Sequence, residues 1–150
     1  MNWITRPGWP GNLLTLLAGA LTPLSMAPFD FWPLSLLSLG LLYLGLRELA
    51  PKAALLRGWY CGFGLFGAGT SWIYVSIHDF GGASPLLAGG LMLLFSAAVA
   101  LFFALPAWLW SRWLRTSRGL FDALAFGALW VVQEAFRGWF LTGFPWLYAG

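Results

Sequence analysis

The chain consists of long apolar runs separated by short segments that contain proline, glycine or charged residues. A membrane-spanning helix needs roughly 17 to 25 predominantly apolar residues in succession. Runs of about that length, bounded by proline, glycine and charges, predict five transmembrane helices. Their expected ranges are 11–27, 31–49, 55–77, 85–110 and 120–140. The pattern therefore predicts an all-α integral membrane fold, a polytopic bundle whose successive helices run in opposite directions.

The basic residues fall unevenly on the two sides of this layout. Only Arg137, among the eight lysines and arginines, lies opposite the N-terminus. Basic residues are retained in the cytoplasm during membrane insertion, so the N-terminus is predicted to be cytoplasmic. The loop at His78 and Asp79 and the segment after residue 140 are then predicted to face outwards. The residues on the N-terminal side are Arg6, Arg47, Lys52, Arg57, Arg112, Arg115 and Arg118.

Composition excludes several other classes of protein. Hydrophobic residues make up 60% of the chain and charged residues 9%, against about 25% charged in soluble domains. The formal net charge is +3, but its basic residues form no patch, so no nucleic-acid partner is expected. Cys61 is the single cysteine, which excludes an internal disulfide, and neither a metal nor a cofactor is expected. No His, Asp, Glu or Lys lies near Cys61 on its C-terminal side, and Cys61 is expected to be an inert packing residue.

The first apolar run is expected to be a retained helix rather than a cleaved signal peptide. A small-residue pattern at 25–27 resembles a cleavage site, but Pro28 would follow the cut and hinder it. Further apolar runs of spanning length follow directly, which favours a multi-pass membrane protein.

Glycines are concentrated in the third predicted helix. At 100° per residue, one helix face carries Gly58, Gly62 and Gly69, whereas Gly64 and Gly67 lie on the other side. Small residues let two helix backbones approach closely, so both faces are predicted to pack against neighbouring helices. A groove for an acyl chain is the alternative interpretation of the same glycines.

Two ionisable residues near the outer end of the fifth helix are candidate substrate contacts. Glu134 and Arg137 are three positions apart and can meet on one helix face. Charged groups at membrane depth are costly and often functional. The pair is predicted either to neutralise itself at the interface or to bind a substrate head group. His78 and Asp79 are expected to be solvated loop residues.

The segment that follows is dense in aromatic residues and is interrupted by a proline. Its candidate substrate-binding residues are Trp139, Phe144, Pro145 and Trp146. Tryptophans at helix ends ordinarily anchor a protein at the membrane interface. A Gly-Phe-Pro-Trp bend also suits a segment that lies across a lipid-facing opening, and both interpretations stay open.

Ordered blocks along the chain resemble the membrane portion of the apolipoprotein N-acyltransferase family. The blocks are APFD at 27–30, WP at 32–33, GFGLFG at 62–67, SWIYVSI at 71–77, FGG at 80–82, Glu134, FRGW at 136–139 and LTGFPW at 141–146. They span most of the chain in the family's order. The chain is identified by this resemblance as the N-terminal part of the family's membrane domain.

The resemblance implies a fold, an activity and partners. Family members combine eight membrane helices with a periplasmic nitrilase-like domain in the bacterial inner membrane. They transfer an acyl chain from a phospholipid to the N-terminal amine of a diacylglyceryl-cysteine lipoprotein, through a cysteine thioester. The catalytic Glu-Lys-Cys triad belongs to the nitrilase-like domain, so no catalytic residue is assigned within 1–150. By this resemblance the chain is a partial transmembrane domain that needs its remaining helices and catalytic domain, and alone it is expected to be inactive.

Two other functions are alternatives to this one. A non-catalytic membrane protein, or part of a transporter, would pack through the glycine-rich third helix, but the two halves show no convincing internal repeat. A self-contained intramembrane enzyme would need paired carboxylates, a nucleophile with its base or a metal cluster at membrane depth. Neither alternative explains the ordered blocks.

Overall fold

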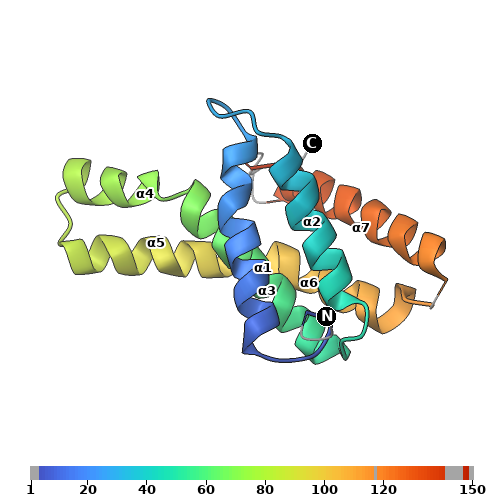
Figure 1. The fold of residues 1–150 in the computed structure, drawn as a ribbon. Coiled ribbons are helices and arrows are strands. Elements are labelled where there is room, and N and C mark those ends of the chain that lie inside the picture. Colours follow the sequence, from blue (N-terminus) through green and yellow to red (C-terminus); the bar gives the residue numbers. More distant parts are fainter. Residues whose placement is uncertain (1–3, 117, 141–146, 149–150) are drawn as a thin grey trace.

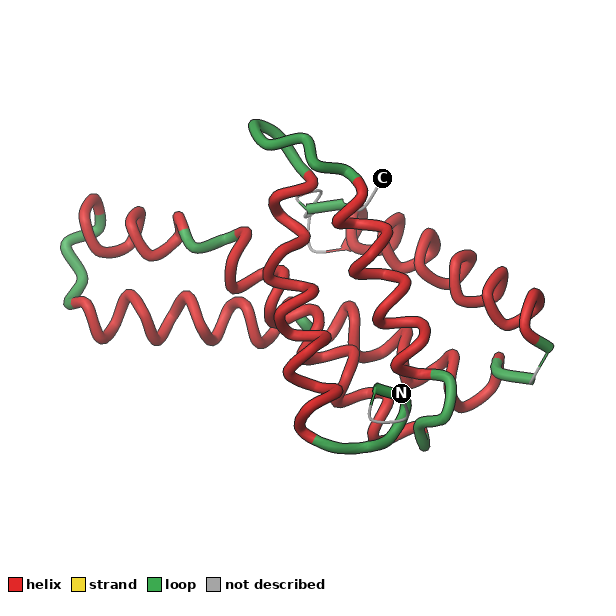
Figure 2. Tube along the Cα trace, in the orientation of Figure 1, coloured by secondary structure: helices red, strands yellow, loops and turns green. Residues whose placement is uncertain are grey.

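The computed structural model describes residues 4–116, 118–140 and 147–148, and every regular element in these residues is helical (Figures 1 and 2). This agrees with the predicted all-α fold. Short 3₁₀ or π turns continue three of the α-helices. The elements are α1 (Trp9–Leu21), η1 (Thr22–Ser25), α2 (Pro33–Leu46), α3 (Pro51–Gly69), α4 (Trp72–Val75), η2 (Ser76–Phe80), α5 (Pro85–Val99), α6 (Leu101–Leu109), η3 (Trp110–Leu114) and α7 (Gly119–Trp139).

Prolines mark where most of the longer helices begin. Pro33, Pro51 and Pro85 are the first residues of α2, α3 and α5, and Pro10 is the second residue of α1. A helix's first turn leaves its N–H groups without partners inside the helix, so proline is tolerated there. Helix α5 is also capped, because the hydroxyl of Ser84 accepts a hydrogen bond from its third residue. These starts follow from local sequence alone.

Helix α3 lies at the centre of the bundle, because glycines on both of its faces let neighbouring helices approach closely. A Cβ on Gly58 would lie 2.6 Å from the carbonyl oxygen of Phe103 in α6, and one on Gly62 would lie 2.9 Å from the Cβ of the same residue. On the other side, a Cβ on Gly64 would clash with the backbone of α1 at Leu16. The prediction that both faces pack closely is therefore confirmed, although Gly67 has open space around it.

The third predicted helix, 55–77, is interrupted in the structure. Helix α3 ends at Gly69, and the chain bends at Thr70 before α4 and η2 continue. Thr70 is fully buried, and its hydroxyl donates to the carbonyl of Phe66 at 2.6 Å. Such a back-bond competes with the regular ladder and bends helices. As a result α4, η2 and α5 form a hairpin that projects sideways from α1, α2 and α3 (left of Figure 1).

Two helical stretches in the described residues are long and apolar enough to cross a membrane. They are Pro85–Leu114, with 30 residues and a mean hydropathy of 2.4, and Gly119–Trp139, with 21 residues and 1.3. Helix α2 is apolar but has 14 residues. Helix α1 stops at Leu21, short of the expected 27, because Pro23 lacks the N–H that would continue it and a 3₁₀ turn follows. Five spans and a cytoplasmic N-terminus stay predictions.

Apolar side chains cover much of the outer surface as well as the centre. Phe66, Trp110 and Leu46 are buried in the core, whereas Phe80 and Leu86 on the projecting hairpin are 87% and 88% exposed. Large contiguous apolar surfaces are rare on monomeric soluble proteins. The outer surface is therefore suited to hydrocarbon rather than to water.

A buried cation ties the N-terminal segment to the bundle. Arg57 of α3 has no exposed surface. Its Nε donates to Asn12 at 3.1 Å, and its two terminal nitrogens donate to the carbonyls of Ile4, Arg6 and Gly45. The sequence places Arg57 among the cations at the cytoplasmic end, whereas the structure encloses it between α1, α2 and α3. Carbonyl dipoles stabilise this guanidinium in place of a carboxylate.

Candidate functional site

Helix α7 carries Glu134, Arg137 and Trp139, the three predicted site residues that the structure describes. All three lie near its C-terminal end. Trp130, Gln133 and Arg137 are buried, and their spacing of three and four places them on one helix face. Glu134 is half-buried beside them. Trp139 is 76% exposed and points away from the core. Arg137 and Glu134 thus lie toward the inner, polar face of α7, whereas Trp139 lies on its outer surface.

Arg137 lies inside the bundle rather than at its surface. Only 1% of its surface is exposed. The guanidinium carbon lies 5.3 Å from the ring centre of Phe66 in α3 and 4.7 Å from that of Tyr148, and Nη2 donates to the carbonyl of Leu147 at 3.4 Å. A cation over an aromatic face is attracted by the ring's quadrupole, more strongly when both are desolvated. Arg137 therefore joins α3, α7 and the C-terminal pair 147–148.

Glycines allow this C-terminal pair to approach both helices. A Cβ on Gly69, at the end of α3, would lie 2.5 Å from the side chain of Leu147. A Cβ on Gly138, next to Arg137, would meet the hydroxyl of Tyr148. Any larger residue at either glycine would push the pair away. The close approach of Leu147 and Tyr148 to the two helices therefore depends on glycine at positions 69 and 138.

A small cavity lies beside Glu134 in the interior. It measures about 10 Å³ and is lined by Thr22, Ser38, Leu39, Leu65, Phe103, Trp130, Glu134 and Leu147. A cavity of this size holds at most a single water molecule. It cannot receive an acyl chain, so lipid contacts of this site must lie on its outer surface.

The inner face of α7 also contains polar atoms without partners among the described residues. These atoms are the indole nitrogen of Trp130 and both amide atoms of Gln133. Buried polar groups in proteins almost always form hydrogen bonds. We therefore expect partners for Trp130 and Gln133 from outside the described residues.

Three of the predicted substrate-binding residues cannot be compared with the structure. Phe144, Pro145 and Trp146 lie outside the described residues. Trp139 is described, and its ring centre lies 6.1 Å from that of Phe136 on the exposed side of α7. Glu134, Arg137 and Trp139 therefore share one end of α7 but not one binding surface.

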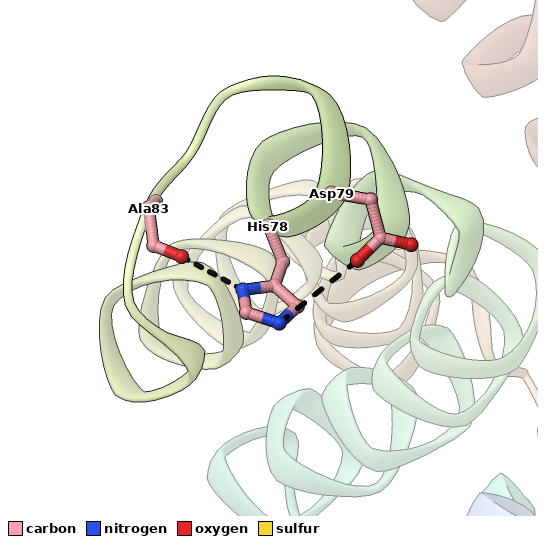
Figure 3. Close-up of polar contacts among 3 residues, drawn as sticks. All are labelled: His78, Asp79 and Ala83. Carbon is pink, nitrogen blue, oxygen red and sulfur yellow. Dashed lines mark hydrogen bonds and ion pairs between the residues drawn. The ribbon is translucent and has the colours of Figure 1, made fainter.

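His78 makes polar contacts with Ala83 and Asp79 at the turn of the projecting hairpin (Figure 3). Nδ1 of His78 lies 2.7 Å from the carbonyl oxygen of Ala83, so this nitrogen carries the proton and donates. Nε2 faces the carboxylate of Asp79 at 3.9 Å. The sequence predicts a solvated pair here, and the structure adds a structural contact across the turn between η2 and α5.

Cys61 is separate from the candidate site. It is 2% exposed, and its own backbone carbonyl packs against Gly19 of α1. A thiol enclosed between helices is inaccessible to a substrate ester. This burial agrees with the predicted packing role.

The aromatic partners of Arg137 were missed by sequence reasoning. Phe66 falls in the glycine-rich block of α3, and Tyr148 follows the aromatic segment. Nothing in the local pattern pairs either ring with an arginine in α7, because the contact is made between distant segments. The one signal in the sequence for an arginine–aromatic contact was that Arg137 lies in a segment rich in aromatic residues.

In the described residues, long apolar helices pack through glycines and enclose two arginines, which is consistent with a helical membrane domain. The chain belongs to the family of the apolipoprotein N-acyltransferase N-terminal domain, whose model matches residues 18–150. This result confirms the resemblance found in the ordered sequence blocks.

Curated relatives extend this comparison. The chain is 74% identical over its whole length to an apolipoprotein N-acyltransferase of Pseudomonas syringae pv. tomato, covering 30% of that protein. It is 73% identical over its whole length to that of Azotobacter vinelandii, covering 29% of the relative. A relative from Coxiella burnetii with the same name is 44% identical over 93% of the chain and 29% of its own length. The chain thus spans about 30% of the curated relatives that it matches.

Proposed function

We propose that this chain forms the membrane platform of an enzyme of bacterial lipoprotein maturation. The enzyme transfers an acyl chain from a phospholipid to the N-terminal amine of a diacylglyceryl-cysteine lipoprotein. It works at the periplasmic side of the inner membrane, where both lipid substrates reach it. Family membership and identities above 70% to proteins named apolipoprotein N-acyltransferase support this proposal.

The chemistry is assigned to residues outside this chain. A cysteine thiolate attacks the acyl ester of the phospholipid, a thioester forms and a lysophospholipid leaves. The lipoprotein amine then attacks the thioester, so that an amide forms and the thiol is regenerated. A glutamate acts as base and a lysine stabilises the oxyanion. Buried Cys61 takes no part in these steps.

The platform's contribution is to place the lipid-facing end of α7. Arg137 holds the pair 147–148 against α3 and α7. We assign Trp139, Phe144, Pro145 and Trp146 to the lipid entry path. Arg137 is a positioning residue, and Glu134 supports it from the same face of α7.

Acylation of a diacylated lipopeptide in phospholipid micelles tests the proposal. The 150-residue chain is compared with the full natural coding sequence that contains it. We expect acyl transfer only from the longer protein, and we expect it to survive Cys61→Ser. Activity of the 150-residue chain alone would place the chemistry within it, and inactivity of both would contradict the proposed activity.

A second measurement tests the assigned lipid path. Trp139→Ala in the full natural sequence is expected to lower kcat/KM for the phospholipid donor by about tenfold, since one aromatic contact contributes roughly 1.4 kcal/mol. Trp113→Ala is the matched control, because Trp113 is also exposed (62%) but lies at the other end of the bundle. Equal effects of the two substitutions would contradict the assignment.

A further inference from the structure

A polar pocket lies at the end of the bundle opposite Arg137. Its volume is about 550 Å³, and it lies where α2 ends and α7 begins. Fifteen residues of α7 separate Asp122 in this pocket from Arg137, which is roughly 22 Å along a helix. The pocket is therefore distinct from the candidate site described above. Its lining residues are Thr5, Leu44, Arg47, Glu48, Arg115 and Asp122.

Arg115 is held in a fixed position in this pocket. Its Nη1 donates to the carbonyls of Leu46, Arg47 and Leu49 at 3.3, 2.9 and 2.8 Å. Leu46 and Arg47 form the C-terminal end of α2, where the helix dipole favours a cation, and Leu49 lies in the link that follows. Nε and Nη2 of Arg115 make no hydrogen bond within the described residues. One edge of the guanidinium is anchored, and the other remains available for a planar pair of anionic oxygens.

The acidic residues of the pocket already have hydrogen-bond donors. Asp122 is 6% exposed and accepts bonds from the N–H and the hydroxyl of Thr116 at 2.8 and 2.9 Å. Glu48 accepts from the hydroxyl of Thr5 at 2.9 Å. The side chain of Arg47 is exposed and has no hydrogen bond or ion pair in the part of the chain that is described. Both carboxylates keep their charge, so the two arginines and two acids of the pocket balance formally, and the guanidinium groups are, among the described residues, its side-chain donors still free to bind an anion.

A separate apolar groove lies between the same two helices, and two of its lining residues, Tyr43 and Ala123, are next in sequence to Leu44 and Asp122 of the pocket. Its volume is about 370 Å³, and it is lined by Leu39, Gly40, Tyr43, Ala123, Phe126, Gly127 and Trp130. Tyr43 of the groove links the two helices, because its hydroxyl donates to the carbonyl of Gly119 at the start of α7 at 3.3 Å. Gly40 and Gly127 have open space where a side chain would stand. A pocket that presents two guanidinium groups beside an apolar groove matches the two ends of a lipid.

We propose that this pocket and groove bind an anionic phospholipid of the leaflet on that side of the membrane. Arg115 and Arg47 contact its phosphate, and an acyl chain lies between α2 and α7 over Gly40 and Gly127. Basic pockets between helices on the cytoplasmic side are suited to anionic head groups. The bound lipid fills the space between α2 and α7 and is not the acyl donor.

Thermal unfolding of the full natural protein in a zwitterionic detergent tests this site. Phosphatidylglycerol is titrated in, and the rise in Tm gives an apparent affinity. Arg47→Gln is expected to weaken that affinity about fivefold, because one basic residue near an anionic lipid contributes about 1 kcal/mol. Arg112→Gln, an exposed arginine outside the pocket, is expected to leave it unchanged. Equal weakening by both substitutions would overturn the site in favour of general surface attraction.

The groove is tested without changing any charge. Gly127→Leu is expected to abolish most of the stabilisation by phosphatidylglycerol while leaving Tm without lipid unchanged. Gly89→Leu is the control, because Gly89 on α5 also has open space around it. If Gly127→Leu lowers Tm in the absence of lipid and Gly89→Leu does not, another part of the protein occupies the groove and the lipid assignment is wrong.

Inorganic phosphate distinguishes the two sources of the anion. We expect millimolar phosphate to leave Tm unchanged, since it offers nothing to the apolar groove. Stabilisation by phosphate equal to that by phosphatidylglycerol would overturn the lipid assignment and leave a simple anion site. Equal stabilisation by phosphatidylcholine would overturn the role of the two arginines.

Discussion

Two buried arginines show how single residues hold this membrane bundle together. Arg57 is surrounded by backbone carbonyls and an amide oxygen, and Arg137 lies between two aromatic rings. Leaving a buried charge without compensation is costly. Each site meets this requirement through partners that come from several segments of the chain. These side chains therefore act as connectors between helices.

Replacing Arg57 tests the first of these connectors. Arg57→Gln is expected to lower the free energy of unfolding by about 3 kcal/mol, because several charge-assisted hydrogen bonds are lost together. Thermal or denaturant unfolding in detergent measures the change. Lys52→Gln, an exposed cation on the same helix, should change stability by less than about 0.5 kcal/mol. A similar small effect for Arg57→Gln would show that its contacts contribute little.

Arg137 can be tested by its geometry as well as by its charge. Arg137→Lys keeps a cation but loses the planar guanidinium that lies over the rings of Phe66 and Tyr148. We expect kcat for acyl transfer to fall several-fold while KM for the lipopeptide changes little, because the residue positions a segment and does not bind the acceptor. A change confined to KM would instead indicate direct contact with substrate.

At the scale of elements, α3 organises the bundle through the spacing of its glycines. One face lies against α6 and the other against α1, at distances that only glycine permits. Close backbone approach provides van der Waals packing that substitutes for the hydrophobic effect within a membrane. Helix α3 is thus fixed from two sides before it bends at Thr70.

Two glycines of α3 form a matched pair for testing this packing. Gly64→Ala places a methyl group against the backbone of α1 and is expected to destabilise the protein by about 2 kcal/mol. Gly67→Ala enters open space and is expected to be neutral or to stabilise by up to about 1 kcal/mol, since alanine favours helix. Unfolding of both variants under the same detergent conditions provides the comparison. Equal destabilisation would contradict the close contact at Gly64.

At the scale of the whole molecule, Arg57 and Arg115 both bind carbonyls near the C-terminal end of α2. Contacts of Arg57 and Arg115 join the N-terminal segment, the link between α2 and α3, and η3. Arg137 lies at the other end of the bundle, beside the last turns of α3. This separation is what the positive-inside rule expects of a chain with its N-terminus in the cytoplasm. The orientation itself is a prediction.

Cysteine labelling tests that orientation. Phe80→Cys and Lys52→Cys each introduce an exposed thiol, and native Cys61 is too buried to contribute a signal. In intact spheroplasts, a membrane-impermeant maleimide is expected to label position 80 at once and position 52 only after lysis. The opposite order would reverse the predicted topology.

Much of the architecture was predictable because it depends on local chemistry. Apolar runs, first-turn prolines and the glycine pattern of α3 predicted helices and close packing on both faces, which the structure confirms. The bend at Thr70 was not predicted, since a threonine in an apolar run also fits a continuous helix. At the candidate site, sequence spacing placed Glu134 and Arg137 on one helix, but it could not reveal which rings lie around the guanidinium.

The sequence by itself determined that this chain is helical, suited to a membrane and a member of its family, because hydrophobic spacing and ordered motifs are properties of nearby residues. Tertiary structure alone decided that Arg57 and Arg137 are buried, that the hairpin of α4 and α5 projects sideways, and that Arg115 lines a polar pocket where α2 ends and α7 begins. The physical reason is that burial and charge compensation depend on atoms brought together from distant positions. No local pattern specifies those partners until the helices pack.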